Sequence, residues 1–224
     1  MPHIFQNELH KLEKYILSLG ALVEERLNQA VESIKNIDRD LAEKVIENDK
    51  EVDQKEVELE EECLKLLALH QPVAIDLRFI VVVLKINNDL ERIGDLVVNI
   101  CESAIFLSHQ PDTQPMFEFS VMSENVKKML KMSLDSLVNM DIETAKQVCK
   151  IDSEIDEMNR NMYEQVEKGI MKHPEYVKIY LYNRSISKHL ERIADLATNI
   201  AEDVIYMIEG EIVRHKDEII SSLE

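Results

Sequence analysis

The sequence contains one acidic phrase twice, and the two copies lie one hundred residues apart. LERIGDLVVNICE occupies residues 90–102 and LERIADLATNIAE occupies residues 190–202, with nine of thirteen positions identical. In a chain of 224 residues, a repeat at this spacing indicates that one half is a duplicate of the other. Each half is therefore expected to fold alike and to carry its own copy of any site.

Apolar residues at spacings of three and four predict long amphipathic helices in the first half. They predict helices over residues 4–37, from Asp38 to about His70, and from Pro72 to about Ser108. Asp38 can cap the second helix through its carboxylate. Pro72 separates the second helix from the third, because proline disfavours helical geometry in the residue before it and is tolerated in a first turn.

The segment 109–115 holds two prolines and several turn formers, and it is the predicted linker between a first bundle, residues 1–110, and a second, residues 116–224. Three further helices are expected over residues 116–139, 141–172 and 174 to at least 209, with a break at His173-Pro174 that repeats the one at Pro72. The predicted fold is all-α, with two tandem three-helix bundles built from six long antiparallel helices.

Charge and composition exclude several classes of protein. The 44 Asp and Glu against 26 Lys and Arg give a formal charge of −18, which disfavours direct binding to nucleic acid or anionic lipid. No apolar run approaches the length of a membrane span, and the N-terminus lacks the features of a secretory signal, which predicts a cytoplasmic protein. Cys63, Cys101 and Cys149 are odd in number and widely spaced, as expected of reduced thiols in a core.

The repeated phrase places its acidic and amide side chains on one stripe of a helix. At about 100° per residue, the polar positions of the first copy fall within roughly 80° of one another, while apolar residues cover the other faces. These positions are Asn88, Glu91, Asp95, Asn99 and Glu102 in the first copy, and the second copy repeats them as Glu191, Asp195, Asn199 and Glu202.

The preceding helix of each half adds a matching acidic pair, Asp49 and Asp53 in one and Asp152 and Asp156 in the other. In an antiparallel hairpin, residues at the same level have numbers that sum to a constant. Asp53 with Glu91, and Asp49 with Asp95, both give 144, which centres the hairpin on Pro72. The corresponding pairs of the second half both give 347, which centres that hairpin between His173 and Pro174. The breaks and the acidic pairs therefore agree in both halves.

Facing acidic pairs repel one another, so this arrangement requires compensation. Cations that prefer oxygen ligands supply it, and asparagine side chains offer further oxygen donors. The predicted metal ligands are Glu91, Asp95, Glu191, Asp195, Asp49, Asp53, Asp152 and Asp156, with Asn99, Glu102, Asn199 and Glu202 as additional candidates. Two other interpretations stay open, namely solvated surface acids without a ligand, and neutralisation by salt bridges from Arg92 and Arg192.

Three phrases together resemble the PhoU family, whose members regulate high-affinity phosphate uptake. They are QPVAIDLR at residues 71–78, NDLERIGD at residues 88–95 and ATNIAED at residues 197–203, and the resemblance covers essentially the whole chain. It implies two three-helix bundles, a homodimer, and multinuclear metal sites built from the repeated acidic motif, with iron, zinc or a similar ion. It further implies contacts with the ATPase subunit of a phosphate transporter and with a membrane sensor kinase.

The two copies of the motif also differ, with Ala194 in place of Gly94 and Thr198 in place of Val98, so the two sites are open to different metal occupancy. His189 replaces Asp89 on the face opposite the acidic stripe and is not expected to be a ligand.

An enzyme with a carboxylate-bridged di-metal centre is the main alternative, because such centres are also built inside helical bundles. They rely on Glu-x-x-His, and none of the seven histidines has a glutamate three residues before it. A zinc hydrolase lacks its histidine pattern, and an ATPase lacks its glycine-rich loop among only four glycines. The remaining alternative is a helical adaptor whose acids bind nothing. The sequence thus favours a non-enzymatic, metal-binding regulator.

Overall fold

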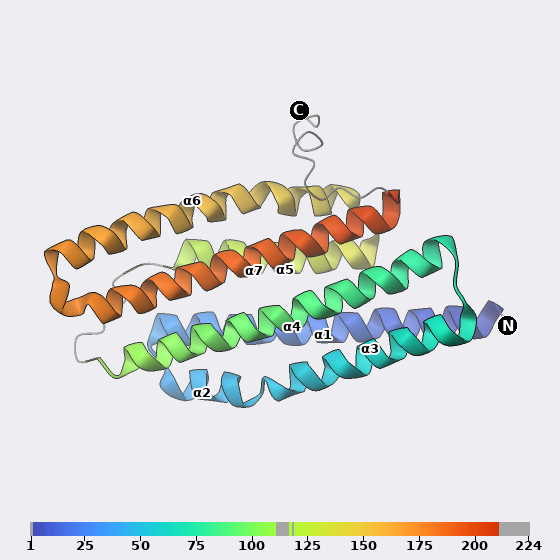
Figure 1. Cartoon of the computed structure of the whole chain (residues 1–224), viewed down its shortest axis with the longest axis horizontal. Coiled ribbons are helices and arrows are strands. Elements are labelled where there is room, and N and C mark those ends of the chain that lie inside the picture. Colours follow the sequence, from blue (N-terminus) through green and yellow to red (C-terminus); the bar gives the residue numbers. More distant parts are fainter. Residues whose placement is uncertain (1, 111–116, 118, 211–224) are drawn as a thin grey trace.

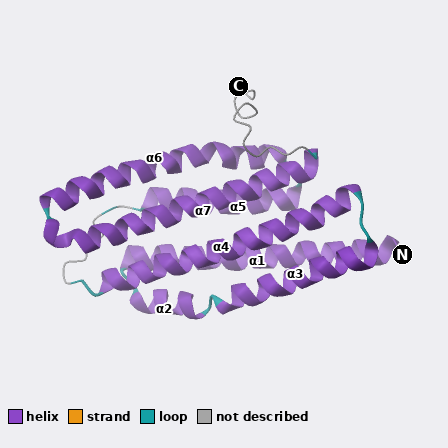
Figure 2. Ribbon diagram, in the orientation of Figure 1, coloured by secondary structure: helices purple, strands orange, loops and turns teal. Residues whose placement is uncertain are grey.

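The computed structural model describes residues 2–110, 117 and 119–210, and every regular element in these ranges is helical (Figure 2). The helices of the first half are α1 (Pro2–Asn36), α2 (Arg39–Glu47), α3 (Lys50–His70) and α4 (Ala74–Ser108). Those of the second half are α5 (Ser120–Asn139), α6 (Ile142–Lys172), the short 3₁₀ helix η1 (Pro174–Tyr176) and α7 (Val177–Glu209). The predicted all-α fold with six long helices is confirmed, with α2 and α3 sharing the place of one of them. The predicted linker at residues 109–115 falls mostly outside the described residues.

The prediction of one uninterrupted helix from Asp38 to about His70 is wrong. The helix is broken at Asn48 and Asp49, where the Asp49 amide donates to the Ile46 carbonyl three residues back instead of four. Short polar side chains such as these favour turns over helix interiors, because they compete for backbone hydrogen bonds. The second half has no such break in α6, so the two halves differ where the first acidic pair begins.

The N-termini of α2 and α6 are built alike in the two halves. Asp38 accepts a hydrogen bond from the amide of Leu41 at 3.0 Å, and Asp141 accepts one from the amide of Glu143 at 3.0 Å. Both carboxylates act as N-caps and hold helix amides that would otherwise lack a partner.

The helices form a layer of four long rods with two more behind it. Along the layer, α3 contacts α4, α4 contacts α7 and α7 contacts α6. Figure 1 shows α1 and α5 behind this layer, where α1 packs on α3 and α4 while α5 packs on α6 and α7. The α3–α4 turn and the α6–α7 turn lie at opposite ends of the elongated molecule (Figure 1). The duplicated halves are therefore related by an approximate two-fold rotation.

A single hydrophobic core runs through both halves and draws on all the long helices. α4 and α7 contribute most to it, because each is covered by its hairpin partner, by a rear helix and by the other. The fully buried side chains of α4 include Ile80, Val82, Val83, Ile86, Leu90, Ile93 and Ile100. The division into residues 1–110 and 116–224 stays a prediction, since the apolar contacts continue across it.

The cysteines are free thiols that belong to this core, as the sequence predicted. Burial raises the pKa of each thiol to about 12, so the thiolate form that binds metals is disfavoured. Within the described residues, no helix is both long and apolar enough to cross a membrane.

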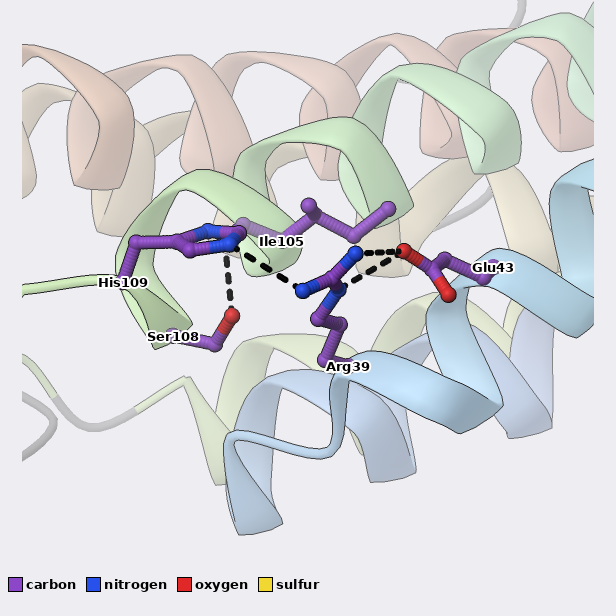
Figure 3. Close-up of polar contacts among 5 residues, drawn as sticks. All are labelled: Arg39, Glu43, Ile105, Ser108 and His109. Carbon is purple, nitrogen blue, oxygen red and sulfur yellow. Dashed lines mark hydrogen bonds and ion pairs between the residues drawn. The ribbon is translucent and has the colours of Figure 1, made fainter.

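Polar contacts link the C-terminal end of α4 to the start of α2, which lies beside it (Figure 3). His109 Nδ1 lies 2.7 Å from the carbonyl of Ile105, which also accepts a bond from Ser108 Oγ at 2.7 Å. His109 Nε2 lies 3.3 Å from Arg39, and Arg39 forms an ion pair with Glu43 at 2.7 Å. These contacts link the end of α4 to α2 just before the chain passes to the second half.

Polar and aromatic contacts fasten α4 to α7 across the boundary between the halves. Lys85 Nζ lies 3.0 Å from Asp203 Oδ1 and 5.2 Å from the centre of the Tyr206 ring. The Asp203 side chain is only 3% exposed, so its charge depends on partners inside the protein. Phe106 and Tyr182 stack with ring centres 3.7 Å apart.

Replacement of Lys85 by alanine is expected to lower the free energy of unfolding by about 2 kcal/mol, because Asp203 stays buried after losing its cationic neighbour. Urea denaturation at pH 7 measures the change. Lys65→Ala is the matched control, since Lys65 pairs with Glu62 on the exposed surface of one helix and should cost less than about 0.5 kcal/mol. Equal losses in the two variants would contradict a role for the Lys85 pair in joining the halves.

Candidate metal centre

Two clusters of carboxylates lie between the paired helices of the layer formed by α3, α4, α7 and α6. The first cluster comprises Asp49, Asp53, Glu91 and Asp95, and it lies between the start of α3 and the middle of α4. The second cluster comprises Asp152, Asp156, Glu191 and Asp195, and it lies between α6 and α7. Every member is half-buried or exposed, so both clusters are open to solvent.

Gly94 allows the first cluster to form close to the backbone of α4. A Cβ atom at this position would lie 3.2 Å from Asp49 Oδ1 and 3.3 Å from Val52 Cγ1. Because glycine has no side chain, Asp49 can approach the helix directly at the point where α2 gives way to α3. In the second half Ala194 takes this place and is fully buried, while Asp152 lies within the continuous helix α6.

The carboxylates of the first cluster act on one another across the hairpin of α3 and α4. Burial, followed by repulsion from Asp53 and Asp95, raises the pKa of Asp49 from 3.8 to about 6, and Arg26 partly opposes the rise. Burial also raises the pKa of Glu91, with repulsion from Asp95, Glu56, Asp53 and Asp49 adding to it. The residues whose numbers sum to 144 therefore lie near one another across the hairpin, as the sequence predicted.

The second cluster shows the same mutual repulsion. Burial and then Asp156 raise the pKa of Asp152 to about 6, and the neighbouring Thr198 hydroxyl opposes this rise. Burial raises the pKa of Asp195 to about 6, and repulsion from Glu191, Asp152 and Asp156 contributes. Each cluster is thus a concentration of negative charge that favours the arrival of a proton or another cation.

Fixed counter-charges do not neutralise the clusters directly. Across the described part of the chain, none of the eight carboxylates pairs with a lysine, arginine or histidine within 4.0 Å. Arg92 pairs with Asp89 at 3.4 Å instead, so its predicted salt bridge to the cluster is absent. Arg192 is close enough to Asp195 to oppose the rise in its pKa, but it forms no ion pair with Asp195.

The additional candidates of the stripe lie one or two helical turns further along α4 and α7. Asn99 donates from its side chain to the Asp95 carbonyl at 2.7 Å, which leaves its amide oxygen as the atom able to act as a ligand. Glu202 is half-buried and near enough to raise the pKa of Asp152. Glu102 is exposed, and Asn199 is half-buried.

Glu56 joins the first cluster and was missed by the sequence pattern. It raises the pKa of Glu91, and its own pKa is raised by burial and then by Glu60 and Asp53. Asn87 donates to its backbone carbonyl at 2.9 Å, which holds α3 against α4 at this level. The same level count pairs Glu56 with Asn88, whose numbers also sum to 144, so the signal was present.

The chemistry of the donor set fits a cation that prefers oxygen ligands, because each cluster offers four carboxylates and asparagine oxygens. Among the residues that the structure describes, no three Asp, Glu, His or Cys side chains are grouped so that they could hold a metal ion. Mutual repulsion favours side-chain rotamers that keep like charges apart, so the carboxylates would have to rotate inward around a bound ion. The four carboxylates of each cluster would hold such an ion through their oxygens, with the asparagine oxygens as additional ligands.

Histidine does not contribute to either cluster among the residues with described side chains. His189, on α7, lies 3.1 Å from Ser185, and burial together with Arg192 and Lys188 lowers its pKa. His10, His70 and His173 lie beside Glu13, Glu8 and Glu175, at sites remote from the clusters in sequence and in contacts. The structure therefore offers no counterpart to the Glu-x-x-His ligands of a di-metal enzyme.

Comparisons with known proteins agree on one family. The model of the PhoU domain matches residues 16–104 and 119–204, once in each half. A phosphate-specific transport system accessory protein PhoU homolog from Aquifex aeolicus is 37% identical over 209 residues, covering 93% of this chain and 95% of the relative. The phosphate-specific transport system accessory protein PhoU from Escherichia coli is 31% identical over 211 residues, covering 94% of this chain and 88% of the relative.

Solved structures show the same similarity in three dimensions. The crystal structure of PhoU from Pseudomonas aeruginosa superposes with a TM-score of 0.89 at 34% identity, covering 92% of this chain and all of that one. The phosphate transport system regulatory protein PhoU from Streptococcus pneumoniae gives a TM-score of 0.87 at 30% identity, covering 93% and 99%.

The raised pKa values predict that the metal-free protein loses stability as the pH rises. A carboxyl with a pKa of about 6 when folded and about 3.9 when unfolded keeps its proton longer in the folded state. The folded state then binds more protons than the unfolded state, so stability falls between about pH 4 and pH 6 and stays lower above this window. Urea denaturation in the presence of a chelator, at several pH values from about 4 to 8, measures this trend.

Asp49→Asn tests which residue causes the trend. At pH 8 the variant should be more stable than the wild type by about 1 kcal/mol, a value reduced for solvent screening of a half-exposed group, and near pH 4 the difference should vanish. Glu61→Gln removes the same charge from an exposed position of α3 and should change stability by less than about 0.5 kcal/mol at every pH. A constant difference between Asp49→Asn and the wild type across the pH range would contradict the assignment.

Proposed function

Because the chain belongs to the PhoU family, we propose that it regulates phosphate uptake as an accessory protein of a phosphate-specific transport system. The observation that carries this proposal is the match over nearly the whole chain, since relatives named as such accessory proteins align over more than nine-tenths of it. The matched segments include both carboxylate clusters, so the proposal extends to the features described above.

The clusters are proposed to bind divalent or trivalent metal ions, such as iron or zinc, through carboxylate oxygens. Four acids that repel one another in each cluster favour a cation, and the lack of direct ion pairs leaves them available to it. A bound ion would draw α3 towards α4 and α6 towards α7, because its ligands come from both helices of each hairpin. Metal binding therefore supports the regulator by fixing the geometry of its front face.

The proposed partners are the ATPase subunit of the phosphate transporter and the membrane sensor kinase of the starvation response, with the chain acting as a homodimeric adaptor in the cytoplasm. The acidic surface, with a net charge of −18, suits basic patches on partner proteins. No catalytic role is proposed, because neither cluster is accompanied by a histidine base or an activated nucleophile among the described side chains.

Metal analysis of purified protein tests the proposed ligands. The variant with Glu91, Asp95, Glu191 and Asp195 all replaced by alanine is expected to lose most of the bound metal measured by plasma mass spectrometry. A control with Glu25, Glu32, Glu61 and Glu167 replaced by alanine removes the same charge from exposed positions and should keep its metal. Equal metal content in the two variants would refute cation binding by the clusters and leave the regulatory proposal intact.

Deletion of the gene in the native host tests the regulatory role. Loss of the protein is expected to raise phosphate uptake and starvation-gene expression in phosphate-rich medium, and a plasmid copy should restore both to the starting level. If uptake of labelled phosphate and expression of the starvation genes are unchanged in the deletion strain, the proposed regulatory function is wrong.

A further inference from the structure

The duplication allows α1 and α5, which form the rear face of the molecule, to be compared residue by residue (Figure 1). Ile37 and Met140, which directly follow α1 and α5, both adopt a left-handed backbone conformation, with φ of 53° and 52°. The amide after each of them donates to the carbonyl five residues before it, at 2.9 Å and 3.0 Å. Residues of α1 therefore correspond to residues of α5 at an offset of 103.

A depression of about 280 Å³ lies between α1 and α5 on the rear face. Its lining contains three residues of α1 together with their counterparts on α5 at the offset of 103, namely Glu24, Leu27 and Asn28 with Lys127, Leu130 and Lys131. Because equivalent residues of the two halves line one space, the approximate two-fold axis of the molecule passes through this depression.

The charges at equivalent positions around this depression differ between the two helices. Two acids and an amide of α1 correspond to three lysines of α5, with Glu24 matching Lys127, Glu25 matching Lys128 and Asn28 matching Lys131. Three lysines within five positions are a local excess of positive charge on a chain whose net charge is −18. The rear face therefore has a negative side on α1 and a positive side on α5.

A second, larger depression extends the negative side. It has a volume of about 520 Å³, lies along α1 and the start of α2, and shares Glu24 and Asn28 with the first depression. Its other acidic residues are Glu25, Glu32 and Asp38, and lysine and arginine are absent from its described lining. The negative side is thus hollow as well as acidic, and it suits cationic side chains that project from a partner.

Charges of both signs on the rear face are available to a partner. Lys127 is paired with Glu124 on its own helix at 2.6 Å. In the described part of the chain, by contrast, Glu24, Glu25 and Lys128 form no ion pair within 4.0 Å. An oppositely charged surface would therefore find unpaired groups on both sides of the face.

Exposed apolar side chains flank the lysines on one stripe of α5. Val121 is 61% exposed and Val138 is 41% exposed. With Lys128 and Lys131 between them, these residues recur at spacings of seven, three and seven, which places all four on the same face of the helix. A partner on the positive side would therefore gain apolar contacts at both of its ends.

We propose that the rear face is the interface of the homodimer, so that its partner is a second copy of this chain. A copy rotated by a half-turn, about an axis that lies in the face and runs along α1 and α5, places its positive side on the negative side of the first copy, and the reverse. Such an interface is self-complementary, as a two-fold dimer requires. A partner of uniform charge would instead be repelled by one of the two sides. This inference rests on the homodimer proposed above and assigns its contact surface.

Charge reversal in the full chain tests this interface. One variant carries Glu24→Lys with Glu25→Lys, the other carries Lys128→Glu with Lys131→Glu, and circular dichroism establishes that both are folded. Each variant alone should dimerise at least about tenfold more weakly than the wild type in sedimentation velocity, because like charges then face one another in both contacts. A mixture of the two variants should recover the affinity of the wild type, since opposite charges meet again in the mixed dimer.

The control variant carries Glu61→Lys with Glu167→Lys, at exposed positions of α3 and α6. It makes the same change in net charge as the first variant and should dimerise like the wild type. Both variants lower the negative charge of the chain and hence the general repulsion between copies, so weaker dimerisation of the first variant alone has a local cause. Native mass spectrometry, with one chain lengthened by a tag, measures the share of mixed dimers.

The outcomes separate this inference from the proposal of a homodimer. Preferential formation of the mixed dimer supports the rear face as the interface. Variants that dimerise like the wild type, and mix in the statistical proportion, would overturn it and leave a homodimer with another interface. Weaker dimerisation that mixing does not recover would also overturn it, because the substitutions would then have damaged each copy. A wild type that stays monomeric at every concentration measured would refute the homodimer itself, and this inference with it.

Discussion

The antiparallel contact between α4 and α7 is the constraint on which the rest of the structure depends. Both helices are apolar on most of their circumference, and each is covered by its hairpin partner, by a rear helix and by the other. Burial of this much apolar surface is the main favourable contribution to folding. Each of the two helices keeps one polar stripe outside the apolar core. The carboxylates of these stripes face the acids of α3 and α6.

That arrangement has an energetic cost in the absence of cations. Carboxylates held together by the packing of two helices cannot move far apart, so burial and then their mutual repulsion raise the pKa values of Asp49, Asp152 and Asp195. The core must supply the stability that the clusters remove. Proteins often accept such a cost where a group of like charges is retained for binding.

Much of this structure could be predicted from the sequence, because its determining signals are local and repeated. The apolar spacing, the breaks at Pro72 and His173-Pro174, and the capping residue Asp38 predicted the helices and their pairing. The interruption at Asn48 and Asp49 was not predicted, since two short polar residues within a strong helical pattern are a weak signal against a whole helix. Its position became evident only when the backbone hydrogen bonds were known.

The residues that surround the clusters were harder to predict from the sequence than the carboxylates that form them. The pairing of residue numbers within a hairpin brings α3 and α4 together, but it gives no information on which residue of α1 influences the cluster. Arg26 could therefore be identified only from the tertiary packing, whereas Glu56 could have been found by pairing residue numbers across the hairpin once more. The pairing of Arg92 with Asp89 also depends on side-chain conformation. Asp89 and Asp95 both lie three residues from Arg92, so spacing alone makes either a plausible partner.

The contacts between Lys85 and Asp203 and between Phe106 and Tyr182 have one more geometric meaning. In both pairs the residue numbers sum to 288, as do those of Gly94 and Ala194, so the approximate rotation axis of the molecule passes at the level of these two small residues. Asp95 and Asp195 follow them directly in the chain. The two clusters therefore lie at the same level along the length of the molecule, one on each side of the contact between α4 and α7.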